Sequence, residues 1–279
     1  MIAVIPRRLL HAVWLTALAA SALPAAAAGF APPTPNAGFD YQIGGDYQLP
    51  PGVSVVSRDW FSGRAAAGPA YSICYVNGFQ TQPDERGVER PDERSNWPSR
   101  LVLSRLGDDP DWGGEYLVDI STRRKRGRAA DWVEQMLEGC AARGFAAVEL
   151  DNLDSWTRFD GTPLARRVPF GERQAVRFAR ALTRRAHRLD LAVAQKNATE
   201  IGRRQARRIG FDFAIAEDCA RYGECRRYRR IHGDRVIAIE YRRRLFRRAC
   251  RQVGDRLSVV LRDRRVSRPG SPSYRYDSC

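Results

Sequence analysis

The chain has 279 residues and a formal net charge of +15 at pH 7. This length is enough for one large α/β domain or two small ones. Beyond the first 28 residues no stretch is apolar for long enough to span a bilayer, which excludes a membrane-spanning mature chain.

The first residues predict a secretion signal over residues 1–28. Arg7 and Arg8 precede an apolar stretch from Leu9 to Leu23, and small residues follow up to Ala28. We expect cleavage near Ala28 and a secreted, extracellular protein of bacterial origin that has no membrane association once the signal is removed. The arginine pair leaves the choice between the general and the twin-arginine export route open.

Residues 29–38, rich in proline, predict a short irregular lead-in. Short apolar runs then recur through the chain and predict strands. In chain order they are Tyr41–Ile43, Val53–Val56, Tyr71–Val76, Tyr116–Val118, Ala146–Leu150, Leu191–Gln195, Phe211–Ala216, Val236–Ile239 and Leu257–Leu261.

Helical periodicity lies between the later runs. The segment from Asp131 to Arg143 places its apolar residues on one stripe and ends at Gly144. The segment from Glu172 to Arg188 repeats this pattern, and Thr199 is the expected N-cap of a helix that ends at Arg208.

Strands that alternate with helices predict a parallel sheet in an α/β protein. Eight or nine strands in about 240 residues favour a (β/α)8 TIM barrel over an open doubly wound sheet, and no glycine-rich dinucleotide motif follows an early strand. We expect a single domain over residues 39–279. One of the nine runs is then extra or lies outside the barrel.

Every predicted strand ends in polar residues, and in such barrels the carboxyl ends of the strands carry the chemistry. Turn formation alone would explain any one of these residues, but their number favours a site. They are Gln42, Asp59, Asn77, Asp119, Asp151 with Asn152, Lys196 with Asn197, Glu217 with Asp218, Glu240 with Tyr241, and Arg262 with Asp263.

These candidates contain several carboxylates and no histidine, which argues against a Ser-His-Asp hydrolase and against most metal hydrolases. A pair of carboxylates on facing strands suits glycoside hydrolysis. Lys196 beside them would keep one carboxylate ionised, while burial would raise the pKa of the other. We expect no cofactor and no metal. Stacking faces for sugars would come from Tyr41, Trp60, Tyr75, Trp156, Tyr222 and Tyr241.

The six cysteines fit an exported protein. Cys219 and Cys225 bracket a short loop and predict a local disulfide, and Cys250 can bridge to the terminal Cys279. Cys74 and Cys140 are then either bridged or both buried thiols. A zinc site is the disfavoured alternative, because no cysteine pair has close metal-ligand spacing.

Arginine supplies nearly all of the positive charge, since Lys125 and Lys196 are the only lysines. The runs 123–128 and 226–230 offer contacts for a polyanion. Because the basic residues are spread over the mature chain, a solvated basic surface is the favoured interpretation and no nucleic-acid partner is expected. A basic polyanion-binding protein remains an alternative, as does a barrel that binds polysaccharide without cleaving it.

Several ordered motifs resemble family-114 glycoside hydrolases, the endo-α-1,4-polygalactosaminidase-like TIM barrels. The resemblance covers essentially the whole mature chain. It rests on the segments 71–82, 144–154, 191–197, 211–219 and 236–241, together with the start at 39–45 and the closing 276–279.

The resemblance implies a retaining, endo-acting glycosidase for α-1,4-linked galactosamine polysaccharide, and we expect it to act as a monomer. It places Asp151 as the nucleophile and Glu217 as the general acid/base. The donor-sugar subsite would be lined by Gln42, Asp59, Asp119, Lys196, Asn197 and Glu240, and we add Asn77, Asn152 and Tyr241 as substrate-binding candidates. A net charge of +15 opposes a cationic polymer over a Debye length of about 10 Å, so an N-acetylated or anionic polymer is the alternative substrate.

Overall fold

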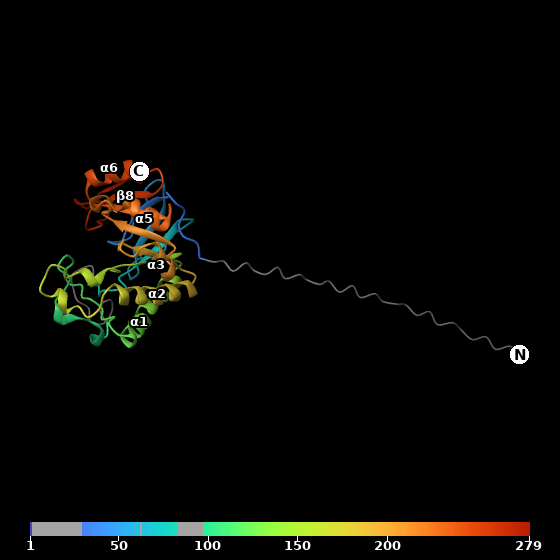
Figure 1. Ribbon diagram of the computed structural model, residues 1–279. Coiled ribbons are helices and arrows are strands. Elements are labelled where there is room, and N and C mark those ends of the chain that lie inside the picture. Colours follow the sequence, from blue (N-terminus) through green and yellow to red (C-terminus); the bar gives the residue numbers. More distant parts are fainter. Residues whose placement is uncertain (2–29, 62, 83–96) are drawn as a thin grey trace.

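The computed structural model of the protein describes residues 1, 30–61, 63–82 and 97–279. Residues 2–28 of the predicted signal lie outside these ranges. Eight strands follow one another in parallel, and a ninth is antiparallel to the eighth (Figure 1). The strands are β1 (Gly38–Tyr41), β2 (Val53–Asp59), β3 (Tyr71–Val76), β4 (Ala147–Leu150), β5 (Ala192–Lys196), β6 (Phe213–Glu217), β7 (Val236–Glu240), β8 (Ser258–Arg262) and β9 (Tyr276–Ser278).

Helices enclose the later strands. The longer ones are α1 (Arg123–Ala142), α2 (Glu172–Arg188), α3 (Arg203–Ile209), α5 (Cys225–His232) and α6 (Arg243–Val253). A short α4 (Cys219–Tyr222) and four 3₁₀ turns complete them: η1 (Ser99–Leu101), η2 (Ser104–Leu106), η3 (Ser155–Thr157) and η4 (Ala165–Arg167). Neighbouring helices contact each other from α1 to α2, to α3, to α5 and to α6 (Figure 1).

The predicted (β/α)8 barrel is confirmed, with corrections to its elements. The run Tyr116–Val118 is the extra one, because it forms only isolated antiparallel bridges with Gln80 and Val102 outside the barrel. Helix α1 starts at Arg123, eight residues before the predicted start, where the Thr122 hydroxyl accepts a hydrogen bond from the Lys125 amide. The predicted N-cap role of Thr199 is wrong: α3 starts after Gly202, and the Thr199 hydroxyl donates to Glu224.

The barrel interior is filled by alternate residues of the strands. Inward-facing positions such as Phe39, Val55, Ile73, Phe213 and Ile239 form one buried apolar cluster. The intervening residues of the same strands pack under the helices in two further clusters. This two-sided burial explains the nearly continuous apolar composition of the strands.

An ion pair spans the seam between β1 and β8, where the sheet order does not return to its first strand. The Arg262 guanidinium donates to Asp40 at 2.7 Å, and neither side chain is exposed to solvent. Arg262 also donates to the carbonyls of Arg275 and Ser267, and Asp40 accepts from Gln42 and from the Tyr41 amide. Both charges are therefore fully hydrogen-bonded, as a buried pair requires.

Three disulfides tie the layers together: Cys74–Cys140, Cys219–Cys225 and Cys250–Cys279. The first joins β3 to α1, and the last holds the C-terminus against α6. The predicted pairings are thus confirmed, and Cys74 with Cys140 is a bridge rather than two thiols. Among the residues that the structure describes, no helix is both long and apolar enough to cross a membrane.

Asp40→Asn tests the seam, because it leaves the buried Arg262 without a carboxylate. We expect the free energy of unfolding to fall by about 3–5 kcal/mol, measured by chemical denaturation with the disulfides intact. The matched control is Asp131→Asn, which removes the partner of Arg185 at a carboxylate that is 68% exposed. That change should cost at most about 1 kcal/mol, and equal effects of the two variants would refute a special role for the seam.

Candidate active site

A cavity of about 1040 Å³ opens at the carboxyl end of the barrel strands. It reaches the upper end of the volumes typical of small-molecule sites, about 300–1000 Å³. Side chains from the carboxyl ends of the eight parallel strands and from the loops that follow them line it.

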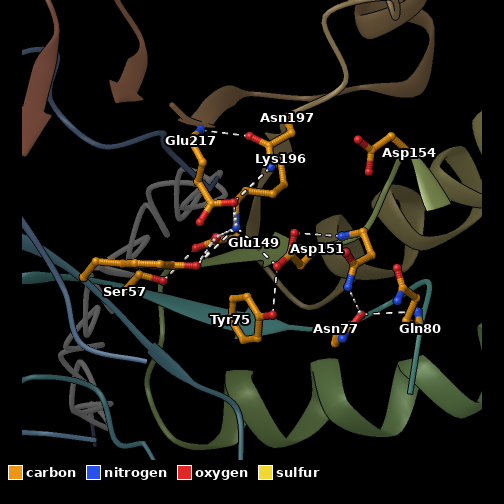
Figure 2. A network of polar contacts seen from close by, with 12 residues as sticks. Ser57, Tyr75, Asn77, Gln80, Glu149, Asp151, Asp154, Lys196, Asn197 and Glu217 are labelled. Atoms are coloured by element: carbon orange, nitrogen blue, oxygen red, sulfur yellow. Dashed lines mark hydrogen bonds and ion pairs between the residues drawn. The ribbon is translucent and has the colours of Figure 1, made fainter. Parts of the chain in front are cut away.

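Lys196, the last residue of β5, lies at the base of this site and is 1% exposed. Its ammonium contacts three carboxylates: Glu149 at 2.8 Å, Asp151 at 3.3 Å and Glu217 at 3.4 Å (Figure 2). Burial alone would lower the pKa of Lys196, but these carboxylates outweigh it and raise the pKa well above its ordinary value. Lys196 therefore remains positively charged, and it lies between β4 and β6, the two strands that flank β5.

Asp151 follows β4 and has its acceptors occupied on both sides. Its Oδ2 accepts from the Tyr75 hydroxyl at 2.8 Å (Figure 2). Its Oδ1 accepts from the Asn152 backbone amide at 2.8 Å. Burial would raise the pKa of Asp151, but Lys196, Tyr75 and the Asn152 amide together lower it below its ordinary value. Asp151 is thus held ionised and fixed in one orientation.

Glu217 ends β6 and faces Asp151 across Lys196. Asn197 donates to its Oε2 at 3.0 Å, and the Tyr241 hydroxyl donates to its Oε1. The Asn197 side-chain oxygen also accepts from the Glu217 backbone amide at 2.9 Å. Asn197 therefore holds both the side chain and the backbone of Glu217 in place.

Glu149 lies two residues before Asp151 on the same face of β4 and is fully buried. It accepts from Ser57 at 2.8 Å, Tyr41 at 2.9 Å and Lys196. Burial raises its pKa above the ordinary value in spite of Lys196. Because it is closed off from the cavity, Glu149 can support Lys196 but cannot touch a ligand.

Sharp turns follow the three central strands. Asn152, Asn197 and Asp218 adopt positive φ angles of 59°, 49° and 51°. Asn and Asp tolerate this left-handed conformation better than other non-glycine residues. The turns direct the chain away from the barrel immediately beyond Asp151, Lys196 and Glu217. Some of the polar residues at the strand ends are therefore explained by the backbone conformation of these turns.

Six of the predicted catalytic and substrate-binding residues line the cavity together: Asp59, Asp151, Asn152, Asn197, Glu217 and Tyr241. The predicted strand-end residue Asp218 and the predicted stacking residues Tyr41, Tyr75, Trp156 and Tyr222 line it as well. Lys196 reaches the same place from beneath the two central carboxylates. Asn77 is 2% exposed and lies under the cavity floor, where it contacts Asn152 (Figure 2).

Three predicted sugar contacts do not line the cavity. Gln42 is fully buried and hydrogen-bonds to Asp40 and Arg58 on the outer side of β1. Asp119 precedes α1 and pairs with Lys125. Glu240 is buried beside the Ala220 amide, which donates to it at 2.7 Å, and burial raises its pKa to about 7.

The cavity contains further residues that the strand-end pattern missed. Glu115 and Trp112 come from the long connection between β3 and α1, and Asp154, Glu200 and Glu224 come from later loops. Trp112 is 41% exposed and Tyr222, a predicted stacking residue, is 63% exposed. Trp60 instead packs against the apolar cluster under the helices. Loop residues carry no periodic signal, so only their folded position identifies them.

The lining of the cavity is acidic although the chain is basic. Its described members carry nine carboxylates and four guanidinium groups. The carboxylates are Asp59, Asp111, Glu115, Asp151, Asp154, Glu200, Glu217, Asp218 and Glu224. The site therefore attracts cations locally, against the net charge of +15.

One group of potential metal ligands lies near the site among the described residues, formed by Cys219, Cys225 and Glu240. The two sulfurs are joined in a disulfide and offer no thiolate. This group is consequently not a zinc site of the cysteine type.

The fold is shared with solved glycosidase structures. Ega3 from Aspergillus fumigatus, in complex with galactosamine, superposes with a TM-score of 0.72 at 18% identity, over 90% of this chain and 98% of that one. The glycoside hydrolase domain of PelA from Pseudomonas aeruginosa gives a TM-score of 0.56 at 13% identity, over 87% and 100% of the two chains. No curated protein sequence matches significantly.

The sequence profile of glycoside-hydrolase family GH114 matches residues 19–279. This span contains the whole barrel and every residue of the acidic cavity. The chain is a glycoside hydrolase and belongs to family GH114.

Proposed function

We propose that the protein is a secreted, retaining, endo-acting glycosidase that cleaves α-1,4-linked galactosamine polysaccharide, with Asp151 as nucleophile and Glu217 as general acid/base. The observation that carries the proposal is the contact of both carboxylates with the single ammonium of Lys196. The third contact of Lys196, Glu149, is buried below the cavity. Asp151 and Glu217 are thus the carboxylate pair that faces a bound sugar.

The spacing of the pair supports retention of configuration. Asp151 Oδ2 and Glu217 Oε2 lie 3.3 Å and 3.4 Å from the same Lys196 Nζ atom. The distance between these two oxygens is therefore at most the sum of the two contact distances. Retaining glycosidases place their carboxyl groups about 5–5.5 Å apart, whereas inverting enzymes need about 6.5–9.5 Å to admit a water molecule.

The assigned roles follow from the surroundings of each group. Asp151, held ionised by Lys196 and Tyr75, attacks the anomeric carbon while Glu217 donates a proton to the departing glycosidic oxygen. In the second step Glu217 takes a proton from water, and the resulting nucleophile releases the sugar from Asp151. Asn197 and Tyr241 keep Glu217 in position through both proton transfers.

The acidic cavity supports a cationic amino-sugar polymer over an anionic one. The net positive charge acts at long range and is screened over a Debye length of about 10 Å, whereas the carboxylates act directly on a bound unit. Galactosamine is the ligand in the related Ega3 structure. The size of the cavity and the exposed aromatic rings of Trp112 and Tyr222 at its edge support binding of several units, as endo action requires.

Two other functions are less well supported. A barrel that only binds sugar has no need for an ionised aspartate and a second carboxylate fixed around one ammonium. A polyanion-binding surface formed by residues 123–128 and 226–230 requires α1 and α5 to lie together, but the contacts between helices run through α2 and α3. Secretion fits the three disulfides and the predicted signal.

A panel of galactosamine, N-acetylgalactosamine and anionic polysaccharides tests the function directly. We expect the wild-type protein to release oligosaccharides of mixed length from the deacetylated α-1,4-galactosamine polymer, detected by mass spectrometry. Asp151→Asn removes the nucleophile at nearly constant shape and should lower kcat by at least about a thousandfold. Release of monosaccharide alone would contradict endo action, and undiminished activity of the variant would contradict the assignment of Asp151.

Glu217→Gln separates the acid/base role from the nucleophile role. On the polymer we expect kcat to fall about 10²–10⁴-fold, because the leaving oxygen is no longer protonated. An aryl oligogalactosaminide with an acidic phenol as leaving group needs no proton, so its first step should lose far less. Asp151→Asn is the matched comparison and should impair both substrates alike; the reverse pattern would exchange the two roles.

Lys196→Met tests the shared ammonium and has a defined pH dependence. The lowered pKa of Asp151 stabilises the fold above its unfolded pKa, near 4, and this contribution disappears as the pH falls through the folded pKa. Lys196, whose pKa is raised, contributes throughout the range below its unfolded pKa of about 10.4. We therefore expect Lys196→Met to lower the free energy of unfolding by about 3–5 kcal/mol at pH 7. This difference from the wild type should become smaller towards pH 4, because the unpaired carboxylates then take up protons.

Chemical denaturation at several pH values measures this effect. Lys125→Met is the matched control, because Lys125 is the other lysine of the chain and its side chain is 35% exposed against Asp119. Lys125→Met should lower the free energy of unfolding by about 1 kcal/mol or less. A cost of Lys196→Met that stays constant between pH 7 and pH 4 would argue against the electrostatic role of Lys196.

A further inference from the structure

A second carboxylate network borders the cavity, next to the Asp151 site. Glu115 lies two residues before the bridge-forming Leu117 and Val118 and lines the cavity. Its Oε2 accepts hydrogen bonds from three side-chain amides: Asn77 at 2.9 Å, Asn152 at 3.0 Å and Gln80 at 3.4 Å. Figure 2 shows Asn77 and Gln80 on this side of Asp151. The amides fix the orientation of the Glu115 carboxyl group.

Glu115 has no cationic partner among the described residues. The Arg158 guanidinium, whose charge acts on Glu115, is bound to Asp109 at 3.1 Å and to Asp154 at 2.9 Å. Oε1 of Glu115 has no hydrogen-bond partner within the described part of the chain. This side of the cavity thus combines an oriented carboxyl group with an Oε1 atom to which no described residue hydrogen-bonds.

One residue couples Glu115 to the proposed nucleophile. Asn152 donates its backbone N–H to Asp151 at 2.8 Å and its side-chain amide to Glu115 at 3.0 Å. A sugar whose anomeric carbon faces Asp151 carries its C2 substituent on the adjacent ring carbon. An amine at that carbon is the group of the substrate best placed to reach Glu115.

We propose that Glu115 binds the protonated amine of the sugar unit held next to Asp151, and so selects galactosamine over N-acetylgalactosamine. Acetylation removes the positive charge and two of the hydrogen-bond donors, so the acetamide offers Glu115 no charge to pair with. The inference rests on the proposed function for the identity of the sugar. It adds a residue that selects the substrate and takes no part in the bond cleavage.

The protonation of Glu115 is consistent with this role. Burial, followed by the proximity of Asp151 and Asp109, raises the pKa of Glu115 to about 8, although the amides of Asn77 and Asn152 oppose the shift. In the free protein at neutral pH the carboxyl group therefore keeps a proton. A bound ammonium favours the ionised form, and the proton passes to solvent.

Binding of monosaccharides, measured by calorimetry on the mature protein, tests the inference without any need for hydrolysis. We expect wild type to bind galactosamine at least about tenfold more tightly than N-acetylgalactosamine. Glu115→Gln keeps the shape and should weaken galactosamine binding by about 10–100-fold, as expected for loss of a charged hydrogen bond. Binding of N-acetylgalactosamine should change less than about twofold. Glu115→Asp keeps the charge and should retain part of the preference.

Glu134→Gln is the matched control, since it makes the same substitution at a carboxylate of α1 that pairs with Arg188 and does not line the cavity. It should leave the ratio of the two affinities unchanged. A preference that survives Glu115→Gln, equal losses for both sugars, or no preference in the wild type would each overturn the inference. If Glu115→Gln abolishes the preference but the wild type cuts no galactosamine polymer, the proposed function fails while the binding role of Glu115 stands.

Discussion

The site depends on one constraint: a buried ammonium must remain in contact with three carboxylates. Lys196 is almost inaccessible to solvent, so its charge is tolerated only while Glu149, Asp151 and Glu217 surround it. These residues come from β4, β5 and β6, and parallel pairing brings the ends of these three strands together. The contacts that make the buried charge of Lys196 tolerable are thus the same contacts that hold Asp151 and Glu217 close together.

The distribution of charge separates two properties of the molecule. Arginines on the helices give the chain its net charge of +15, whereas the cavity lining is acidic. Net charge therefore describes solubility and long-range encounter, and the substrate is selected by the local groups. Within the cavity, burial raises the pKa of Glu115 whereas the ammonium of Lys196 lowers the pKa of Asp151, so the two carboxyl groups differ in charge state.

The alternation of side chains along a strand explains much of what the sequence predicted about the site. Phe213 and Ile215 point into the barrel, and Glu217 follows in the same alternation. The same rule places Asp151 on the face of Glu149, and Tyr241 on the face of Ile239. It also explains why Gln42 and Glu240 miss the cavity, because each is one residue out of step with the inward-facing positions of its strand. A polar residue at a strand end therefore reaches the cavity only when it is in step with the inward-facing positions of its strand.

The sequence by itself determined the eight barrel strands, the barrel class, the local pair Cys219–Cys225 and the two carboxylates at the ends of β4 and β6, because these features depend on local composition and on the alternation along a strand. Only the tertiary structure decided that Asp119 belongs to a helix start rather than a strand end, and that Glu115 reaches Asn152 across 37 residues. Loop residues have no periodicity, so their position depends on non-local contacts. The three carboxylates around Lys196 likewise acquire their charge states only when folding removes them from water.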